Sequence, residues 1–140
     1  MNSVGQPERA TQDRVIQLFT SELGYTFLGT WTDRAGNSNI EDALLEAHLA
    51  TAGYSPPHVA KAIHALRIEA DNPGRSLYDN NHAVYQRLRY GVQVKVAAGE
   101  NNETVHFIDW DTPGNNHFAI AEEVTVKGGH ERRPDLVLYI

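Results

Sequence analysis

Two kinds of hydrophobic pattern divide the chain into a helical part and a part made of strands. Up to about residue 91, apolar residues recur three or four positions apart, as on one face of an α-helix. From Val92 onward, stretches of apolar residues alternate with other residues, as in half-buried strands. We therefore expect an α/β fold in which helices pack on a mixed sheet.

Capping and helix-breaking residues set the limits of the expected helices. Pro7 suits the first turn of an opening helix that ends near Gly24. Asn39 is the expected N-cap of a second helix, while Ser55 precedes a third and Ser76 caps a fourth. These later helices predict a helical insertion at about residues 33–91 within a domain that spans residues 1–140.

The last third of the chain is expected to hold strands at 92–96, 104–110 and 118–126, followed by the apolar run 136–140. A continuous apolar run is typical of a central strand that is buried on both faces. Since natural domains seldom finish on such a strand, we expect 1–140 to be a partial, C-terminally truncated domain.

Composition narrows the class of protein. The chain has no cysteine, which excludes disulfides and cysteine-ligated zinc. No segment approaches the ~20 apolar residues of a membrane span, and the polar N-terminus has no signal core, so we expect a cytoplasmic protein without membrane contact. The net charge of −6 argues against a free-standing nucleic-acid binder, although other domains could supply the grip on DNA.

A Pro134-Asp135 pair stands directly before the final apolar run. Taken alone, Asp135 could simply bond a nearby backbone N–H in a turn. The alternative is catalytic, because hydrolysis of a phosphodiester uses a divalent metal and Mg²⁺ usually takes one or two protein carboxylates. A carboxylate at the end of a rigid strand is well placed for that task.

Five segments of the chain carry a further signal, namely PERATQDRVIQLFTSELGY at 7–25, NIEDALLEAHLATAGYS at 39–55, RLRYGVQVKV at 87–96, VHFIDWDTPGNNHFAIAEEVTV at 105–126 and RRPDLVLYI at 132–140. In this order they resemble the N-terminal region of the R subunit of type I restriction enzymes. The resemblance implies a PD-(D/E)xK restriction-endonuclease-like core. It also implies a type I site-specific deoxyribonuclease that cleaves double-stranded DNA with Mg²⁺ after ATP-driven translocation.

The resemblance assigns roles to individual residues. Asp135 matches the first catalytic aspartate and metal ligand, and Glu8 matches an acidic position that helps to hold metal or water. Glu8 could equally be an exposed residue that stabilises a helix N-terminus. Arg132 and Arg133 could contact DNA phosphates or neutralise the surrounding acidic surface. The family's Glu-x-Lys element matches nothing in this chain, so we expect the fragment alone to be inactive.

The expected partners are double-stranded DNA and the modification and specificity subunits. ATP would bind only through motor domains outside this chain, which has no GxxxxGK[ST] sequence. The alternative function is a non-catalytic docking module for the motor or the methyltransferase. Glu122 and Glu123, which are adjacent in an expected strand, should point to opposite faces and be solvated or hydrogen-bonded.

Overall fold

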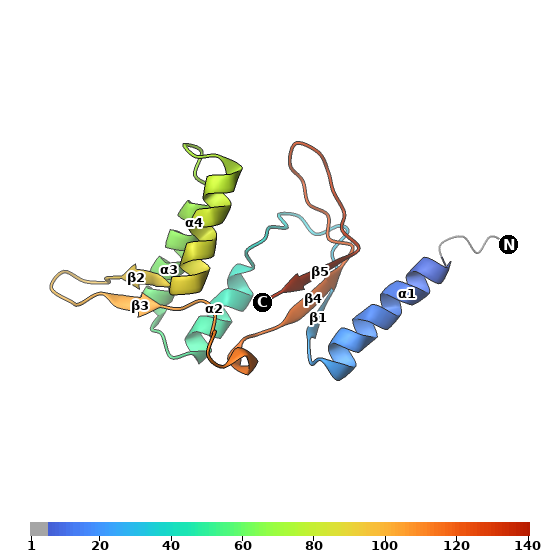
Figure 1. Cartoon of the computed structure of the whole chain (residues 1–140), viewed down its shortest axis with the longest axis horizontal. Helices are drawn as coiled ribbons and strands as arrows, with labels where there is room; N and C mark the ends of the chain where they lie inside the picture. Colours follow the sequence, from blue (N-terminus) through green and yellow to red (C-terminus); the bar gives the residue numbers. More distant parts are fainter. Residues whose placement is uncertain (1–5) are drawn as a thin grey trace. The chain divides into compact units, whose positions relative to one another are not determined.

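The computed structural model describes residues 6–140, which form four α-helices and two small sheets (Figure 1). The α/β class expected from the sequence is confirmed. The chain divides into two compact units, the first formed by the residues up to Asn39 together with His117–Ile140, the second by Ile40–Asn116.

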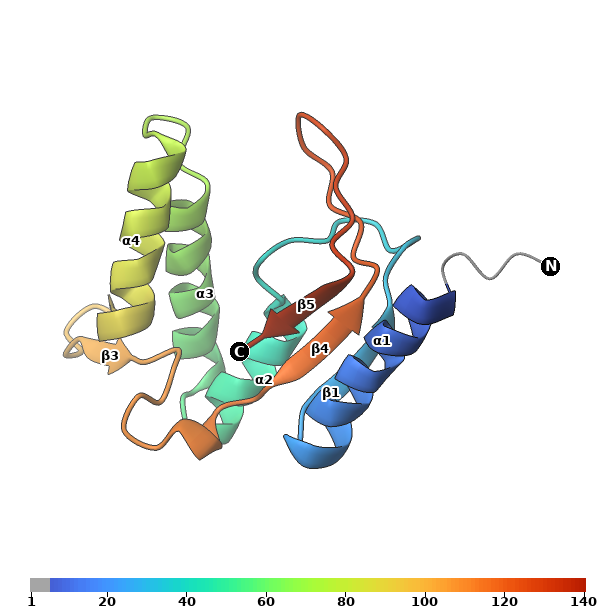
Figure 2. The ribbon, with the colours of Figure 1, turned by 45° about the vertical axis from the view of Figure 1, so that its right-hand side comes forward.

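The first unit contains the opening helix and a mixed sheet. Helix α1 (Gln6–Gln17) passes into a π-helical turn, and the chain then enters strand β1 (Thr26–Thr30). The sheet has the order β1-β4-β5, with β1 parallel to β4 (Ala119–Glu122) and β4 antiparallel to β5 (Leu136–Tyr139). Helix α1 runs alongside this sheet (Figure 2).

Strand β4 is the central strand of the sheet, and all four of its residues are buried. Its N-terminal neighbour Phe118 continues into an aromatic cluster, where the Tyr25 ring centroid lies 5.4 Å from that of Phe118 and 4.9 Å from that of Phe19. The apolar core of this unit is therefore small, and it is centred on the short strand β4.

The final apolar run does not behave as a buried central strand within the described residues. Strand β5 pairs with β4 along one edge, and Leu138 is 47% exposed. The reason is that no other described strand lies beside β5. Strand β4 is also shorter than the expected 118–126, because Glu123 adopts a positive φ of 51° and ends the regular pairing.

The second unit contains three helices and a hairpin. Helices α2 (Asp42–Thr51), α3 (Pro56–Ala70) and α4 (Leu77–Tyr90) are followed by strands β2 (Val92–Val94) and β3 (Glu103–Val105). The helices are those that the sequence placed at 33–91, and the hairpin joins them in the same unit. The residues of the apolar core are Leu49, Val59, Ala62, Ile63, Leu66, Val92, Val94, Val105 and Phe107.

The helix ends of this unit show which capping predictions hold. The Ser76 hydroxyl accepts a hydrogen bond from the Asp79 N–H, so this N-cap is confirmed. The predicted N-cap Asn39 is wrong, since α2 is preceded by Glu41. Helix α4 ends at Gly91 with φ of 81°, where a Cβ would lie 2.7 Å from the Val105 carbonyl oxygen; only glycine allows this close passage into the hairpin.

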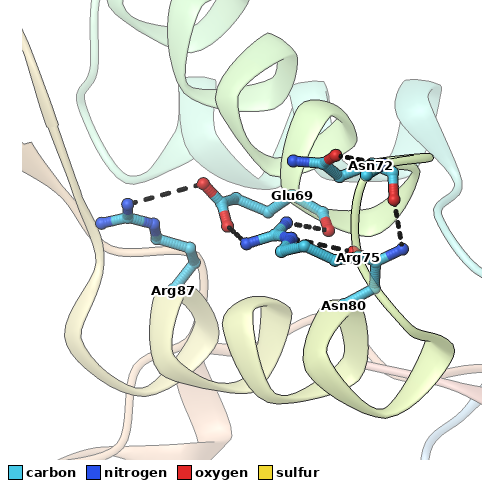
Figure 3. A network of polar contacts seen from close by, with 6 residues as sticks. Glu69, Asn72, Arg75, Asn80 and Arg87 are labelled. Carbon is cyan, nitrogen blue, oxygen red and sulfur yellow. Dashed lines mark hydrogen bonds and ion pairs between the residues drawn. The ribbon is translucent and has the colours of Figure 1, made fainter.

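A polar network fixes the turn between α3 and α4 (Figure 3). The Arg75 guanidinium donates to the Asn80 side-chain oxygen at 3.0 Å and pairs with the Glu69 carboxylate at 3.1 Å. The Asn80 amide, which is buried, donates to the Asn72 carbonyl at 3.1 Å. The buried polar atoms of this turn are thus satisfied, as burial requires.

Candidate functional site

One face of helix α1 and the segment before β5 line a common hollow of about 390 Å³, which we call the Glu8–Asp135 hollow. Glu8, Thr11, Gln12 and Val15 share a face because they recur three or four residues apart on a helix. Asp135 and Leu136 complete the lining of the hollow. The two carboxylates that the sequence singled out are therefore brought together by the fold.

The backbone at Pro134 and Asp135 is anchored to the end of β4. The Glu123 N–H donates to the Asp135 carbonyl at 2.9 Å, and the Val124 N–H donates to the Pro134 carbonyl at 3.2 Å. These bonds continue the β4–β5 pairing beyond the regular strands. These hydrogen bonds fix the backbone at Asp135, as is required of a residue in a preorganised site.

A buried carboxylate, Glu122, joins α1 to the sheet. Its oxygens accept hydrogen bonds from Thr30 Oγ1 at 2.6 Å and from Gln12 Nε2 at 3.0 Å, and they form an ion pair with Arg9 at 2.9 Å. Burial alone would raise the pKa of this carboxyl, but the bonds from Thr30, Arg9 and Gln12 together hold its pKa below the ordinary value. Glu122 is therefore a buried charge that links helix α1 to the sheet, and we call it the charged pin of this unit.

The expectation that Glu122 and Glu123 point to opposite faces is wrong at this position. Gln12 Nε2 lies 3.0 Å from a Glu122 oxygen and 3.3 Å from a Glu123 oxygen, so one side chain reaches both. The cause is the positive φ of Glu123, which breaks the alternation of the strand. The expectation that Glu122 is hydrogen-bonded is confirmed.

A second hollow of about 410 Å³ lies in the same unit, between the loop 32–37 and the turn 127–133. We call it the Arg34–Arg133 hollow. Its charged lining comprises three cations and two carboxylates, namely Arg34, Lys127, Arg133, Asp33 and Glu131. Of the two arginines that the sequence singled out for DNA contact, Arg133 lines this hollow; Arg132 is exposed beside it and donates to the Glu131 carbonyl.

The residues of the Glu8–Asp135 hollow offer oxygen ligands of the kind that Mg²⁺ prefers, and two carboxylates are a usual number for this ion. Within residues 6–140, no group of three or more His, Cys, Asp or Glu side chains is placed to hold a metal ion. Glu8 and Asp135 are the two carboxylates that line this hollow, so a metal held there would need water or other groups to complete its coordination.

Sequence reasoning missed the residues that surround these carboxylates. Gln12 could have been found, because it stands four residues after Glu8 on the same helical face. Thr30, which donates to Glu122, carried no signal, since it meets that carboxylate only through the pairing of β1 with β4, which are far apart in the sequence.

A family model described as the type I restriction enzyme R protein N terminus matches residues 5–140. The chain belongs to this family. The match spans nearly the whole chain and includes both units and both hollows. The family resemblance stated from the quoted segments is thereby confirmed.

As the N-terminal region of a restriction enzyme R subunit, the chain is part of a protein that works with other subunits and DNA. Among curated proteins and solved structures, none matches the chain. None of the helices within residues 6–140 has the length and apolar character needed to cross a membrane.

Proposed function

We propose that this region of the R subunit carries part of a Mg²⁺-dependent endonuclease site for double-stranded DNA, with Asp135 and Glu8 as metal ligands. The observation that supports this proposal is the convergence of the two side chains on one hollow from opposite ends of the chain.

The proposed chemistry is hydrolysis of a phosphodiester. When bound, a divalent ion lowers the pKa of an attacking water and offsets the charge that develops on the phosphate. Asp135 would hold its ligand oxygen on the anchored backbone, and Glu8 would add a second oxygen from α1. Gln12 lines the hollow and donates a hydrogen bond to Glu122, and it would thereby hold α1 in position against the sheet.

We further propose the PD-(D/E)xK arrangement for this site. The Glu-x-Lys element of that arrangement matches no residue of this chain, so other parts of the R subunit would supply it. The intact enzyme would act in the cytoplasm with modification and specificity subunits, and motor domains would use ATP. Arg132 and Arg133 would contact DNA phosphates.

The test is DNA cleavage by the R subunit assembled with its partner subunits. We expect Asp135→Asn to abolish Mg²⁺-dependent cleavage while ATP hydrolysis and assembly persist, and Glu8→Gln to reduce cleavage. The matched controls are Asp71→Asn and Glu22→Gln, which change exposed residues of the same types outside the hollow. Unchanged cleavage by Asp135→Asn would disprove the metal-ligand assignment.

The second candidate function is docking, and the surface of helix α4 favours it. Leu77, Tyr78 and Tyr85 are 75%, 79% and 57% exposed, and tyrosine is enriched at protein interfaces. On this alternative the second unit would bind the motor or the methyltransferase. Loss of assembly in Tyr78→Ser and Tyr85→Ser, together with full cleavage by Asp135→Asn, would favour docking over catalysis.

A further inference from the structure

A pocket of about 740 Å³ lies within the second unit, and we call it the Tyr90–Asp111 pocket. It is lined by the end of helix α2 with the turn after it, by the end of helix α4 and by the segment 106–115 that follows strand β3. Its walls combine aromatic rings with charged groups. All of the lining residues belong to the second unit, so the pocket is separate from the proposed metal ligands of the first unit.

The aromatic rings of the pocket are held in place and remain accessible. Trp110 Nε1 donates to the Leu88 carbonyl at 2.9 Å, which fixes the indole against helix α4, and Trp110 is still 46% exposed. Tyr90 is 70% exposed. The Tyr54 hydroxyl accepts a hydrogen bond from the His106 N–H at 3.1 Å, which fixes a third ring. Rings of this kind offer contact area to a flat apolar or cationic group.

Carboxylates outnumber cations in the pocket. Asp109 accepts hydrogen bonds from the Thr112 N–H at 2.8 Å and from the Asn115 amide at 2.9 Å, and these bonds hold the pKa of Asp109 below its ordinary value. Asp109 is therefore charged at neutral pH. Among the described residues that line the pocket, Arg89 is the one cation beside the carboxylates of Asp109 and Asp111, with the histidines counted as neutral. The pocket therefore has an excess of one negative charge.

The pocket already contains one guanidinium group. The Arg89 guanidinium carbon lies 5.0 Å from the centroid of the Trp110 ring, which is a cation–π contact. In the part of the chain that the structure describes, neither Asp109 nor Asp111 forms an ion pair with Arg89 or with another side chain. The aromatic wall thus suits a planar cation, and the two carboxylates are available to balance the charge of a second one.

The same features disfavour other ligands. An excess of negative charge repels the phosphates of a nucleic acid. A metal ion is disfavoured because, within residues 6–140, no three His, Cys, Asp or Glu side chains are grouped to hold one. Arginine is favoured over lysine because its guanidinium is planar, stacks on aromatic rings and is more weakly hydrated than an ammonium group.

We propose that the Tyr90–Asp111 pocket receives an arginine side chain of a partner subunit. Asp109 and Asp111 balance the charge of this arginine, and Tyr90 and Trp110 contact its planar group. The assignment to a partner subunit rests on the family, since the chain is part of an R subunit that works with other subunits. Arginine and exposed aromatic side chains are also the residues that most often anchor protein interfaces.

The first experiment titrates the chain with acetylated hexaarginine amide at neutral pH and about 150 mM KCl, near physiological ionic strength. The chain has two tryptophans, so in Trp31→Phe the fluorescence reports Trp110. We expect the peptide to change this fluorescence. In this background Asp111→Asn should weaken the binding by about two- to fivefold, as the loss of one exposed ion pair does. The matched control is Asp71→Asn, which removes the same charge from an exposed residue of the second unit outside the pocket.

The peptide titration has three outcomes that would overturn the proposal. One is the absence of a fluorescence change up to about 1 mM hexaarginine, the range of very weak binding. Another is equal weakening in Asp111→Asn and Asp71→Asn, which would assign the binding to net charge alone. The third is equal affinity for hexalysine, because the pocket should bind the hydrated ammonium group less well than the guanidinium.

The variant Arg89→Ala separates a cationic ligand from a nucleic acid. Without Arg89 the excess of negative charge in the pocket rises from one to two, so hexaarginine should bind about two- to fivefold more tightly. Lys95→Ala is the control, because it removes the same charge from an exposed lysine outside the pocket. A single-stranded oligothymidylate that changes the Trp110 fluorescence, and binds more weakly to Arg89→Ala, would assign the pocket to nucleic acid and overturn the proposal.

The intact R subunit tests the source of the arginine. Asp111→Asn should weaken its affinity for the complex of the modification and specificity subunits by about two- to fivefold, and Asp71→Asn should not. Unchanged assembly in Asp111→Asn would overturn the assignment to a partner subunit. Assembly and peptide binding are measured with EDTA present, so they are independent of the metal site. Full cleavage by Asp135→Asn would instead defeat the proposed function.

Discussion

In the unit formed by Ile40–Asn116, helices and hairpin meet in an apolar core, whereas in the unit that holds the sheet β1-β4-β5 the helix α1 is tied to the sheet by the buried carboxylate of Glu122. An apolar core depends on volume and shape. A buried charge depends on each of its partners and on pH. The two units should therefore respond to different kinds of substitution, and the unit with the charged pin is also the one that carries both hollows.

The chain offers a separate probe for each unit. Trp31 lies in the first unit and Trp110 in the second, so the variants Trp110→Phe and Trp31→Phe each leave one reporter. Unfolding followed through each reporter shows which unit a substitution affects. Loss of stability that appears equally in both would mean that the units unfold together.

The largest effect is expected in the apolar core of the second unit. Ile63 on α3 is 7% exposed, and Ile63→Ala should lower the free energy of unfolding by about 2–5 kcal/mol, because it removes buried methyl groups and leaves a cavity. Urea denaturation followed through Trp110 measures it. Ile68→Ala is the control on the same helix; Ile68 is 51% exposed, and we expect a change within about 0.5 kcal/mol. Equal losses in the two variants would contradict the assignment of the core.

A smaller effect is expected at the pin of the first unit. Gln12→Ala removes the hydrogen bonds to Glu122 and Glu123, and bonds to charged groups contribute about 1.5–3 kcal/mol. The loss should appear through Trp31. Gln17→Ala, which changes an exposed glutamine at the end of α1, should leave the transition near that of the unchanged chain. If Gln12→Ala has no more effect than this control, α1 is not held through Glu122.

The smallest and most specific effect concerns pH. The pKa of Glu122 is lower in the folded chain than its ordinary value, so ionised Glu122 stabilises the folded state. This stabilisation is present above the unfolded pKa of about 4.3 and is lost as the pH falls through the lower folded pKa. We expect the Trp31 transition to weaken as the pH falls below about 4.3, the unfolded pKa of glutamate.

The comparison variant is Glu122→Gln, which should be less stable at neutral pH but show a flatter pH dependence. In the second unit the corresponding carboxyl is Asp109, whose pKa is lowered by the Thr112 N–H and the Asn115 amide. Asp109→Asn should flatten only the Trp110 transition. A Trp31 transition with the same acid dependence in Glu122→Gln would assign that dependence to other carboxylates.

Much of the local structure followed from the sequence because its causes are local. Pro7, Ser55 and Ser76 predicted where three helices begin, and Gly91 predicted where the last ends. Asp135 and Glu8 could be singled out from residue type, position and resemblance. The prediction at Asn39 failed because the helix starts instead after Glu41, whose own conformation is extended.

Other features could not be read from the sequence because they depend on pairing between distant segments. The alternation at 118–126 predicted one long strand, but the positive φ of Glu123 ends it at Glu122 and turns both carboxylates toward Gln12. The run 136–140 predicted a buried strand, whereas burial depends on which strands lie beside it.

The sequence by itself thus determined the α/β class and most helix limits, since periodicity and capping act over a few residues. The resemblance of its segments indicated the family and singled out the carboxylates proposed as metal ligands. The tertiary structure decided that Glu8 and Asp135 line one hollow, that Glu122 links α1 to the sheet, and that Arg34, Lys127 and Arg133 line another. The physical reason is that strand pairing and burial bring together residues whose separation along the chain carries no signal of their contact.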